Sequence, residues 1–184
     1  MHPAADPRLK ARTIALVGLM GVGKSSVGRR LAQALEMPFK DADDEIERAA
    51  GRSVSEIFAD RGEVEFRDGE RRVIQRLLEE PPHVLATGGG AFAQPATRAL
   101  IKQGAVSVWL RADLEVLARR LARKDNRPLL KGRDPIEVLS ALAEARFPAY
   151  AEADLEIQTG DTPHQATVDA IIAALTRRLE PASS

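Results

Sequence analysis

The sequence contains no cysteine, which excludes disulfide bonds, thiolate catalysis and zinc sites with cysteine ligands. Its three histidines, His2, His83 and His164, are scattered along the chain and give no reason to expect a histidine metal site. Any bound metal is therefore expected to be a hard cation held by oxygen ligands.

The sequence also lacks an excess of either charge and lacks long apolar runs. Lys plus Arg and Asp plus Glu both number 27, so the formal net charge is 0 and nothing suggests a nucleic acid or an anionic membrane as partner. No run approaches the ~18 consecutive apolar residues of a membrane span, and residues 1–10 lack the apolar segment of a secretion signal. We therefore expect a cytoplasmic protein, and its 184 residues suit one domain.

Residues 18–26, GLMGVGKSS, fit the phosphate-binding pattern G-x-x-x-x-G-K-[ST]. The apolar run 13–17 predicts a strand before this loop, and apolar spacing predicts a helix over 24–36 after it. In that setting the loop's backbone N–H groups surround a phosphate, Lys24 reaches the β- and γ-phosphates, and the Ser25 hydroxyl holds Mg²⁺. The alternative is a glycine-rich turn without a ligand.

Carboxylates follow the next predicted strand, residues 39–41, and continue into a helix. Because side chains two apart on a strand share a side, Asp41 and Asp43 are expected to point together toward the ligand-binding edge of a parallel sheet. One would face Mg²⁺ and the other a substrate hydroxyl. The alternative is that Asp43 or Asp44 caps the helix and that the remaining acids are solvated.

Two helices in succession, with no strand between them, then interrupt the alternation of strand and helix. A capping box at 53–56 opens one helix, and after a turn at Gly62 an amphipathic helix spans 63–79. We interpret this region as an insertion over the sheet edge. Arg67 lies in it and contacts a substrate only if the insertion covers one; otherwise it is ion-paired or solvated.

The third predicted strand, 83–86, leads into Gly88, Gly89 and Gly90. These glycines form either a flexible turn or a place where a ligand approaches the backbone, which we favour. The basic segment 123–135 is either a flap over phosphates or a solvated loop. The remaining predicted elements are helices at 95–103, 113–122, 135–147 (ended by Pro148) and 165–179, strands at 105–110 and 154–157, and disordered tails at 1–10 and 180–184.

Six motifs in order over most of the chain resemble the shikimate kinase family: GLMGVGKSS, DADDEIE, EFR, ATGGGA, RPLL and RFPAY. The resemblance implies an α/β three-layer P-loop kinase with a five-stranded parallel sheet flanked by helices. It implies one domain, with a substrate-binding insertion at about 43–80 and a lid at about 123–135, and a monomer is expected. It also implies transfer of the ATP γ-phosphoryl group to the 3-hydroxyl of shikimate, giving shikimate 3-phosphate and ADP, in the pathway to chorismate and aromatic amino acids.

The resemblance assigns roles residue by residue. Lys24, Asp43 and Arg127 would be catalytic, with Asp43 the candidate base, and Ser25 would ligate Mg²⁺ with Asp41 in its outer shell. The ATP-binding residues would be Gly21, Val22, Gly23, Lys24, Ser25, Ser26, Arg120 and Arg127. The shikimate-binding residues would be Asp43, Arg67, Gly88, Gly89, Gly90 and Arg146.

The chain departs from the family pattern after Arg146, where Pro-Ala-Tyr-Ala-Glu replaces the usual Pro-Leu-Tyr-Arg or Pro-Leu-Tyr-Glu. No aspartate ends the third strand as a Walker B acid, and the resemblance gives the metal role to Asp41. A rival is a kinase for gluconate or a nucleoside monophosphate, but Arg67, Arg146 and three glycines suit a small carboxylated ring better. A GTPase-like switch would need an N-K-x-D segment, which the sequence lacks.

Overall fold

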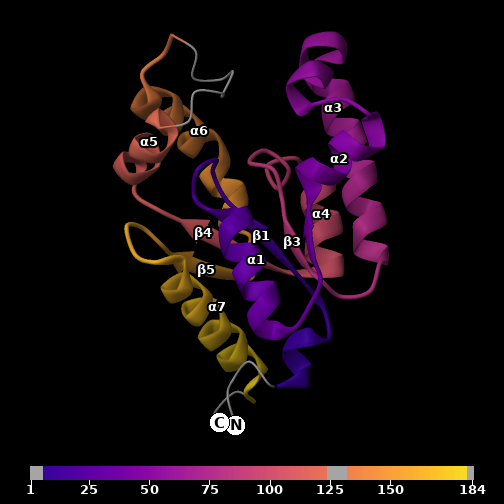
Figure 1. The fold of residues 1–184 in the computed structure, drawn as a ribbon, viewed down its shortest axis with the longest axis vertical. Helices are drawn as coiled ribbons and strands as arrows, with labels where there is room; N and C mark the ends of the chain where they lie inside the picture. The colour runs from indigo at the N-terminus through magenta and orange to yellow at the C-terminus, as the bar shows by residue number, and fades with distance from the viewer. Residues whose placement is uncertain (1–5, 124–131, 182–184) are drawn as a thin grey trace.

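A computed structural model describes residues 6–123 and 132–181 (Figure 1). Five strands form one parallel sheet in the order β2-β3-β1-β4-β5. The strands are β1 (Thr13–Val17), β2 (Phe39–Asp41), β3 (Val84–Ala86), β4 (Ala105–Arg111) and β5 (Leu155–Gln158). The helices are α1 (Lys24–Leu35), α2 (Ala42–Ala50), α3 (Val54–Glu79), α4 (Pro95–Gly104), α5 (Leu114–Ala122), α6 (Pro135–Tyr150) and α7 (His164–Leu179). The expected five-stranded P-loop architecture is confirmed.

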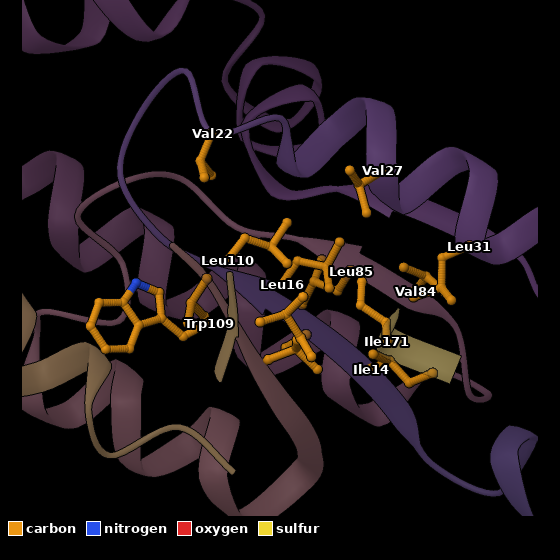
Figure 2. Packing of buried hydrophobic residues seen from close by; sticks show 14 of the residues in the cluster. Ile14, Leu16, Val22, Val27, Leu31, Val84, Leu85, Trp109, Leu110 and Ile171 are labelled. Carbon is orange, nitrogen blue, oxygen red and sulfur yellow. The ribbon is translucent and has the colours of Figure 1, made fainter. Parts of the chain in front are cut away.

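Helices cover the sheet because its central strands are apolar on both sides. All five residues of β1 are buried, as continuous apolar runs in parallel sheets usually are. Helix α1 packs beside α7 in front of the sheet, and α4 packs against α3 and β4 (Figure 1). Figure 2 shows side chains of β1 and β3 meeting Val27 and Leu31 of α1 and Ile171 of α7.

The parallel register brings three strand ends to one edge. Val84 pairs with both Ile14 and Phe39, so β1, β2 and β3 advance together. The glycine loop after β1, the acidic segment after β2 and the triple glycine after β3 consequently emerge side by side. This is the edge at which open parallel sheets bind ligands.

Helices α2 and α3 form the interruption expected between β2 and β3. They enclose a small apolar cluster of their own, Ile46, Ile57 and Phe66. The turn expected at Gly62 is a kink within α3, where φ is +81° and favours glycine. Ser53 caps α3 by accepting a hydrogen bond from the Glu56 N–H, as the capping-box pattern predicts.

Two expectations at helix and chain ends are wrong. Helix α6 continues through Pro148 to Tyr150 because the proline removes only one backbone donor, while Phe147 and Tyr150 pack against Trp109 at centroid distances of 5.1 and 5.7 Å. The expected disorder of residues 1–10 does not hold for Pro7–Lys10, a 3₁₀ helix anchored by buried Leu9. Among the residues described, no helix is long and apolar enough to cross a membrane.

Candidate active site

The glycine loop between β1 and α1 depends on backbone conformations that favour glycine. Gly21 and Gly23 have φ of +82° and +97°, and α1 begins directly after Gly23, so its free N–H groups face the loop. A Cβ at Gly18 would lie 2.6 Å from the Leu110 carbonyl oxygen, so this glycine also lets the loop pack onto β4. The side chain of Val22 is buried, which leaves only its backbone to contact a ligand.

Lys24 lies inside this loop. Its Nζ donates hydrogen bonds to the carbonyl oxygens of Gly18 at 2.6 Å and Leu19 at 3.1 Å, and the side chain is buried. The ammonium group is therefore held beside the space that the loop encloses, as a phosphate-binding lysine requires.

Asp41 connects the loop to α2. Its Oδ2 accepts a hydrogen bond from the Ser25 hydroxyl at 2.6 Å, while its Oδ1 accepts from the N–H groups of Asp43 and Asp44. Asp41 is thus the helix cap, and the alternative that Asp43 or Asp44 fills this position is wrong. Asp43 lies in the first turn of α2, so a helical turn and not strand alternation brings the two carboxylates together.

A cavity of about 210 Å³ joins these groups. It is lined by Met20, Gly21, Gly23, Lys24, Ser25, Ser26, Asp41, Asp43, Thr87, Gly88 and Gly89. Burial is the main cause that raises the pKa of Asp43 above its ordinary value, the charge of Asp41 raises it further, and Lys24 opposes the shift. A carboxylate with a raised pKa is a better proton acceptor than a solvated one.

The donor set at Ser25 and Asp41 fits Mg²⁺. Within residues 6–123 and 132–181, no three His, Cys, Asp or Glu side chains gather to hold a metal. Mg²⁺ does not need such a cluster, because it typically takes one or two protein oxygens and completes its shell with water and nucleotide phosphate. A hydroxyl and a carboxylate at the loop meet that requirement.

Arg67 does not line this cavity but lies at Gly90, next to the lining residues Gly88 and Gly89, and it pairs with a carboxylate that no motif indicated. Its Nη1 donates to Glu70 Oε1 at 2.9 Å, and Glu70 is only 1% exposed. Burial is the main cause that raises the pKa of Glu70, and Arg67 opposes this shift. The spacing of three residues on a predicted helix was the available signal, because residues at i and i+3 are neighbours on a helix.

The triple glycine leaves room for side chains of the site itself. A Cβ at Gly88 would lie 2.9 Å from Asp43 Oδ1, and one at Gly89 would lie 3.2 Å from Arg146 Nη1. A Cβ at Gly90 would lie 2.7 Å from Arg67 Cζ. Arg67 and Arg146, from different helices, therefore meet at neighbouring glycines, so the protein's own side chains require glycine here, while the approach of a ligand to this backbone stays a prediction.

Tyr150 of α6 contacts this turn through a hydrogen bond. Its hydroxyl donates a hydrogen bond to the Gly89 carbonyl oxygen, and the side chain is fully buried. Burial raises the pKa of Tyr150 to about 12. In the sequence, Tyr150 stands out only as part of the motif that departs from the family pattern, because no local pattern shows that α6 reaches the triple glycine.

The expected nucleotide side of the site is built around Arg120. Its Nη1 donates to the carbonyl oxygens of Gly21 at 3.1 Å and Val22 at 3.2 Å, and its Nη2 donates to that of Gly160. His164 lies against Gly23, and burial lowers its pKa with help from the charges of Arg120 and Arg30. Arg127, the expected lid residue, lies outside the described residues.

Comparison with known proteins agrees with this geometry. The family model described as "Shikimate kinase" matches residues 20–176. A shikimate kinase of Caulobacter vibrioides (strain NA1000 / CB15N) is 71% identical over 167 residues, which are 91% of this chain and 84% of the relative. The chain belongs to the shikimate kinase family. It is therefore a kinase, and its reaction is the ATP-dependent phosphorylation of shikimate.

One solved structure and one further sequence relative are also similar to this shikimate kinase family member. A solved structure titled "Shikimate kinase from Acinetobacter baumannii in complex with shikimate" superposes with a TM-score of 0.88 at 38% identity, covering 94% of this chain and 98% of the other. A shikimate kinase of Paramagnetospirillum magneticum is 56% identical, over 92% of this chain and 87% of the relative. A gluconokinase from Sinorhizobium meliloti, with a TM-score of 0.62 at 21% identity, shares the fold alone.

Proposed function

We propose that the cavity between the phosphate loop, the start of helix α2 and the turn after β3 is where ATP phosphorylates the 3-hydroxyl of shikimate, and that Asp43 is the proton acceptor. In this step the hydroxyl oxygen bonds to the γ-phosphorus, the bond from that phosphorus to ADP breaks, and the hydroxyl proton passes to the Asp43 carboxylate. The observation that carries the proposal is the half-buried Asp43 in one cavity with Lys24 and Ser25.

The phosphate loop would position ATP. The backbone N–H groups of Gly21 to Ser26 would surround the phosphates, and Lys24 would leave its carbonyl partners to meet the γ-phosphate. Mg²⁺, when bound near Ser25 and Asp41, would neutralise charge on the phosphate oxygens. Arg120 would lie near the adenine, and Arg127 would approach the phosphates as part of a lid at about 123–135.

Arg67 and Arg146 would hold the shikimate carboxylate. Both guanidinium groups lie at the triple glycine, and a guanidinium fork matches the two oxygens of a carboxylate. The backbone of Gly88 to Gly90 would form the wall beside them. We further propose that the chain acts as a monomer in the cytoplasm and is one domain with a substrate-binding insertion at about 43–80.

The substitution Asp43→Asn tests the central assignment. It removes the proton acceptor but keeps the side-chain shape, so turnover should fall by about 10²-fold or more while ATP affinity stays within about twofold. Because the raised pKa of Asp43 means that the folded state disfavours its charge, the variant should also be more stable at pH 7, by about 0.5–2 kcal/mol.

Steady-state kinetics, nucleotide titration and urea unfolding measure these effects. The stability gain should vanish near pH 3, because a group with a raised folded pKa stabilises the fold below its unfolded pKa and loses that contribution as the pH rises. Near-normal turnover in Asp43→Asn would remove this residue from the chemistry.

A further inference from the structure

A second cavity lies between α2 and the kinked α3. It has a volume of about 440 Å³ and shares no lining residue with the cavity at the phosphate loop. It is lined by Ile46, Ala49, Ala50, Arg52, Ile57, Arg61, Glu65, Phe66, Gly69, Arg72 and Val73. Its size falls within the range of small-molecule sites, about 300–1,000 Å³.

One glycine of α3 lines the apolar part of this cavity. Gly69 lies within α3, does not have a positive φ, and would have nothing within 4 Å of an added Cβ. Glycine is less favourable than alanine inside a helix. Neither a positive φ nor close packing requires glycine at position 69, and the space beside it is free for an apolar group.

The rim of the cavity presents one cation and one anion that form no ion pair with any described residue. Arg52 pairs with Asp60 and Glu56, and Arg72 pairs with Asp68 at 2.8 Å. Within the part of the chain that the structure describes, the other two charged lining residues, Arg61 and Glu65, form no ion pair. An apolar space with one free charge of each sign at its edge is complementary to a zwitterion.

We propose that this cavity binds an α-amino acid with a large apolar side chain, and that binding there changes the affinity of the enzyme for shikimate. The side chain fills the space beside Phe66 and Gly69, the carboxylate meets Arg61, and the ammonium group meets Glu65.

The helices that form the cavity also carry the shikimate side of the proposed active site. Phe66 and Gly69 line the cavity. The residues that follow them in α3, Arg67 and Glu70, form the ion pair beside the triple glycine. Helix α2 begins at the Asp41 cap and holds Asp43 in its first turn. A ligand that fixes α2 against α3 therefore acts on three groups of the shikimate site, and the coupling is reciprocal.

Calorimetric titration of the full chain with L-phenylalanine tests the binding. Glycine, 3-phenylpropanoate and 2-phenylethylamine each lack one of the three recognised groups, and each should bind at least about fivefold more weakly. The absence of saturable binding of L-phenylalanine, or equal binding of 3-phenylpropanoate and 2-phenylethylamine, overturns the proposal.

Three variants locate the site. Gly69→Leu fills the cavity and should weaken L-phenylalanine binding by about tenfold or more, with a melting temperature no lower than that of the parent chain. Arg61→Ala and Glu65→Gln remove one rim charge each and should weaken it by about two- to fivefold. Arg177→Ala, an exposed arginine on α7, is the matched control and should change it by less than about twofold. Unchanged binding in Gly69→Leu and Arg61→Ala would place L-phenylalanine elsewhere and refute the site.

Initial rates test the coupling, which rests on the proposed function. Saturating L-phenylalanine should change the KM for shikimate by about threefold or more, leave the KM for ATP within about twofold, and have no effect in Gly69→Leu. An unchanged KM for shikimate refutes the regulatory role. Calorimetry needs no turnover, so a failure of the shikimate reaction itself is distinguishable from a failure of this site.

Discussion

Glu70 is the buried residue that fixes the position of Arg67. One carboxylate oxygen accepts the Arg67 hydrogen bond at 2.9 Å, while Glu70 Oε2 and Arg67 Nε have no hydrogen-bond partner among the residues described. A buried charge left without its partner is strongly destabilising, whereas the intact pair contributes little net stability. The pair is therefore better explained by orientation of the guanidinium group than by stability of the fold.

A double substitution separates these two effects. Arg67→Ala leaves Glu70 buried and unpaired, so it should lower the free energy of unfolding by about 3–5 kcal/mol. It should also raise the KM for shikimate by about tenfold or more, because a charge-assisted contact is lost. Adding Glu70→Gln should restore most of the stability but not the KM, as urea unfolding and steady-state kinetics will show. Recovery of the normal KM in the double variant would mean that Arg67 has no direct contact with shikimate.

The raised pKa of Tyr150 leads us to expect a lower free energy of unfolding at alkaline pH. Burial raises its pKa to about 12 in the folded protein from the ordinary tyrosine value of 10.0, so the folded state retains a proton that the unfolded state releases. The contribution is complete below pH 10 and should disappear as the pH rises from 10 to 12, lowering the free energy of unfolding by about 2–3 kcal/mol.

Urea unfolding of the parent chain and of Tyr150→Phe between pH 9 and 12 checks this prediction. The variant lacks the titrating hydroxyl, so the difference in stability between the two proteins should shrink across this interval. A difference that stays constant would show that folding does not raise the pKa of Tyr150.

At the scale of an element, the turn at Gly88 to Gly90 is shaped by side chains from α2, α3 and α6. None of these three glycines has a positive φ, so the need for glycine is spatial and not conformational. Asp43, Arg67 and Arg146 occupy the space where the missing Cβ atoms would lie. The turn and the helices around it therefore define one another's positions.

Substitution of Gly89, which faces Arg146, and of Gly90, which faces Arg67, should change the KM for shikimate by different amounts. Gly90→Ala places a methyl group 2.7 Å from Arg67 Cζ, whereas Gly89→Ala places one 3.2 Å from Arg146 Nη1. Arginine ends can move, so both variants should stay folded, but Gly90→Ala should raise the KM for shikimate by about tenfold and Gly89→Ala by about two- to threefold. Equal KM values for the two variants, measured at saturating ATP, would contradict this account of the turn.

For the whole molecule, the sheet order places three unrelated segments at one edge. The loop after β1, the cap of α2 and the turn after β3 are far apart in sequence, yet all line one cavity. Because helices on both sides bury the sheet, this edge is held by the same core that stabilises the fold (Figure 2). Ligands that bridge these segments should therefore stabilise the entire domain.

Thermal unfolding with Mg-ATP tests this expectation and the magnesium assignment together. At a nucleotide concentration about 100 times the dissociation constant, binding adds about 2.7 kcal/mol, or roughly 5–10 °C in melting temperature for a chain of this size. Chelation of Mg²⁺ should remove most of this shift, and Ser25→Ala should reduce its dependence on Mg²⁺. An equal shift with ATP in the presence of a chelator would remove Mg²⁺ from the nucleotide site.

Local patterns in the sequence predicted most elements within about two residues, because apolar spacing, glycine and capping residues act locally. Helix α6 was the exception, since the packing of Phe147 and Tyr150 on Trp109 outweighs the effect of Pro148. For Asp41 and Asp43, the expectation of a shared site agrees with the cavity, but the reason was wrong: the strand ends at Asp41 and the helix begins at Ala42, so Asp43 does not continue the strand.

The sequence by itself determined the glycine loop, its lysine and serine, the order of strands and helices, and the family. It determined them because each is written in neighbouring residues whose spacing has a direct physical meaning. Only the tertiary structure decided that Glu70 is buried and paired with Arg67, that the Tyr150 hydroxyl donates a hydrogen bond to Gly89, and that Gly69 lines a second cavity. Those contacts depend on how α2, α3 and α6 pack against the sheet edge, and no local pattern records the distance between residues that meet only after folding.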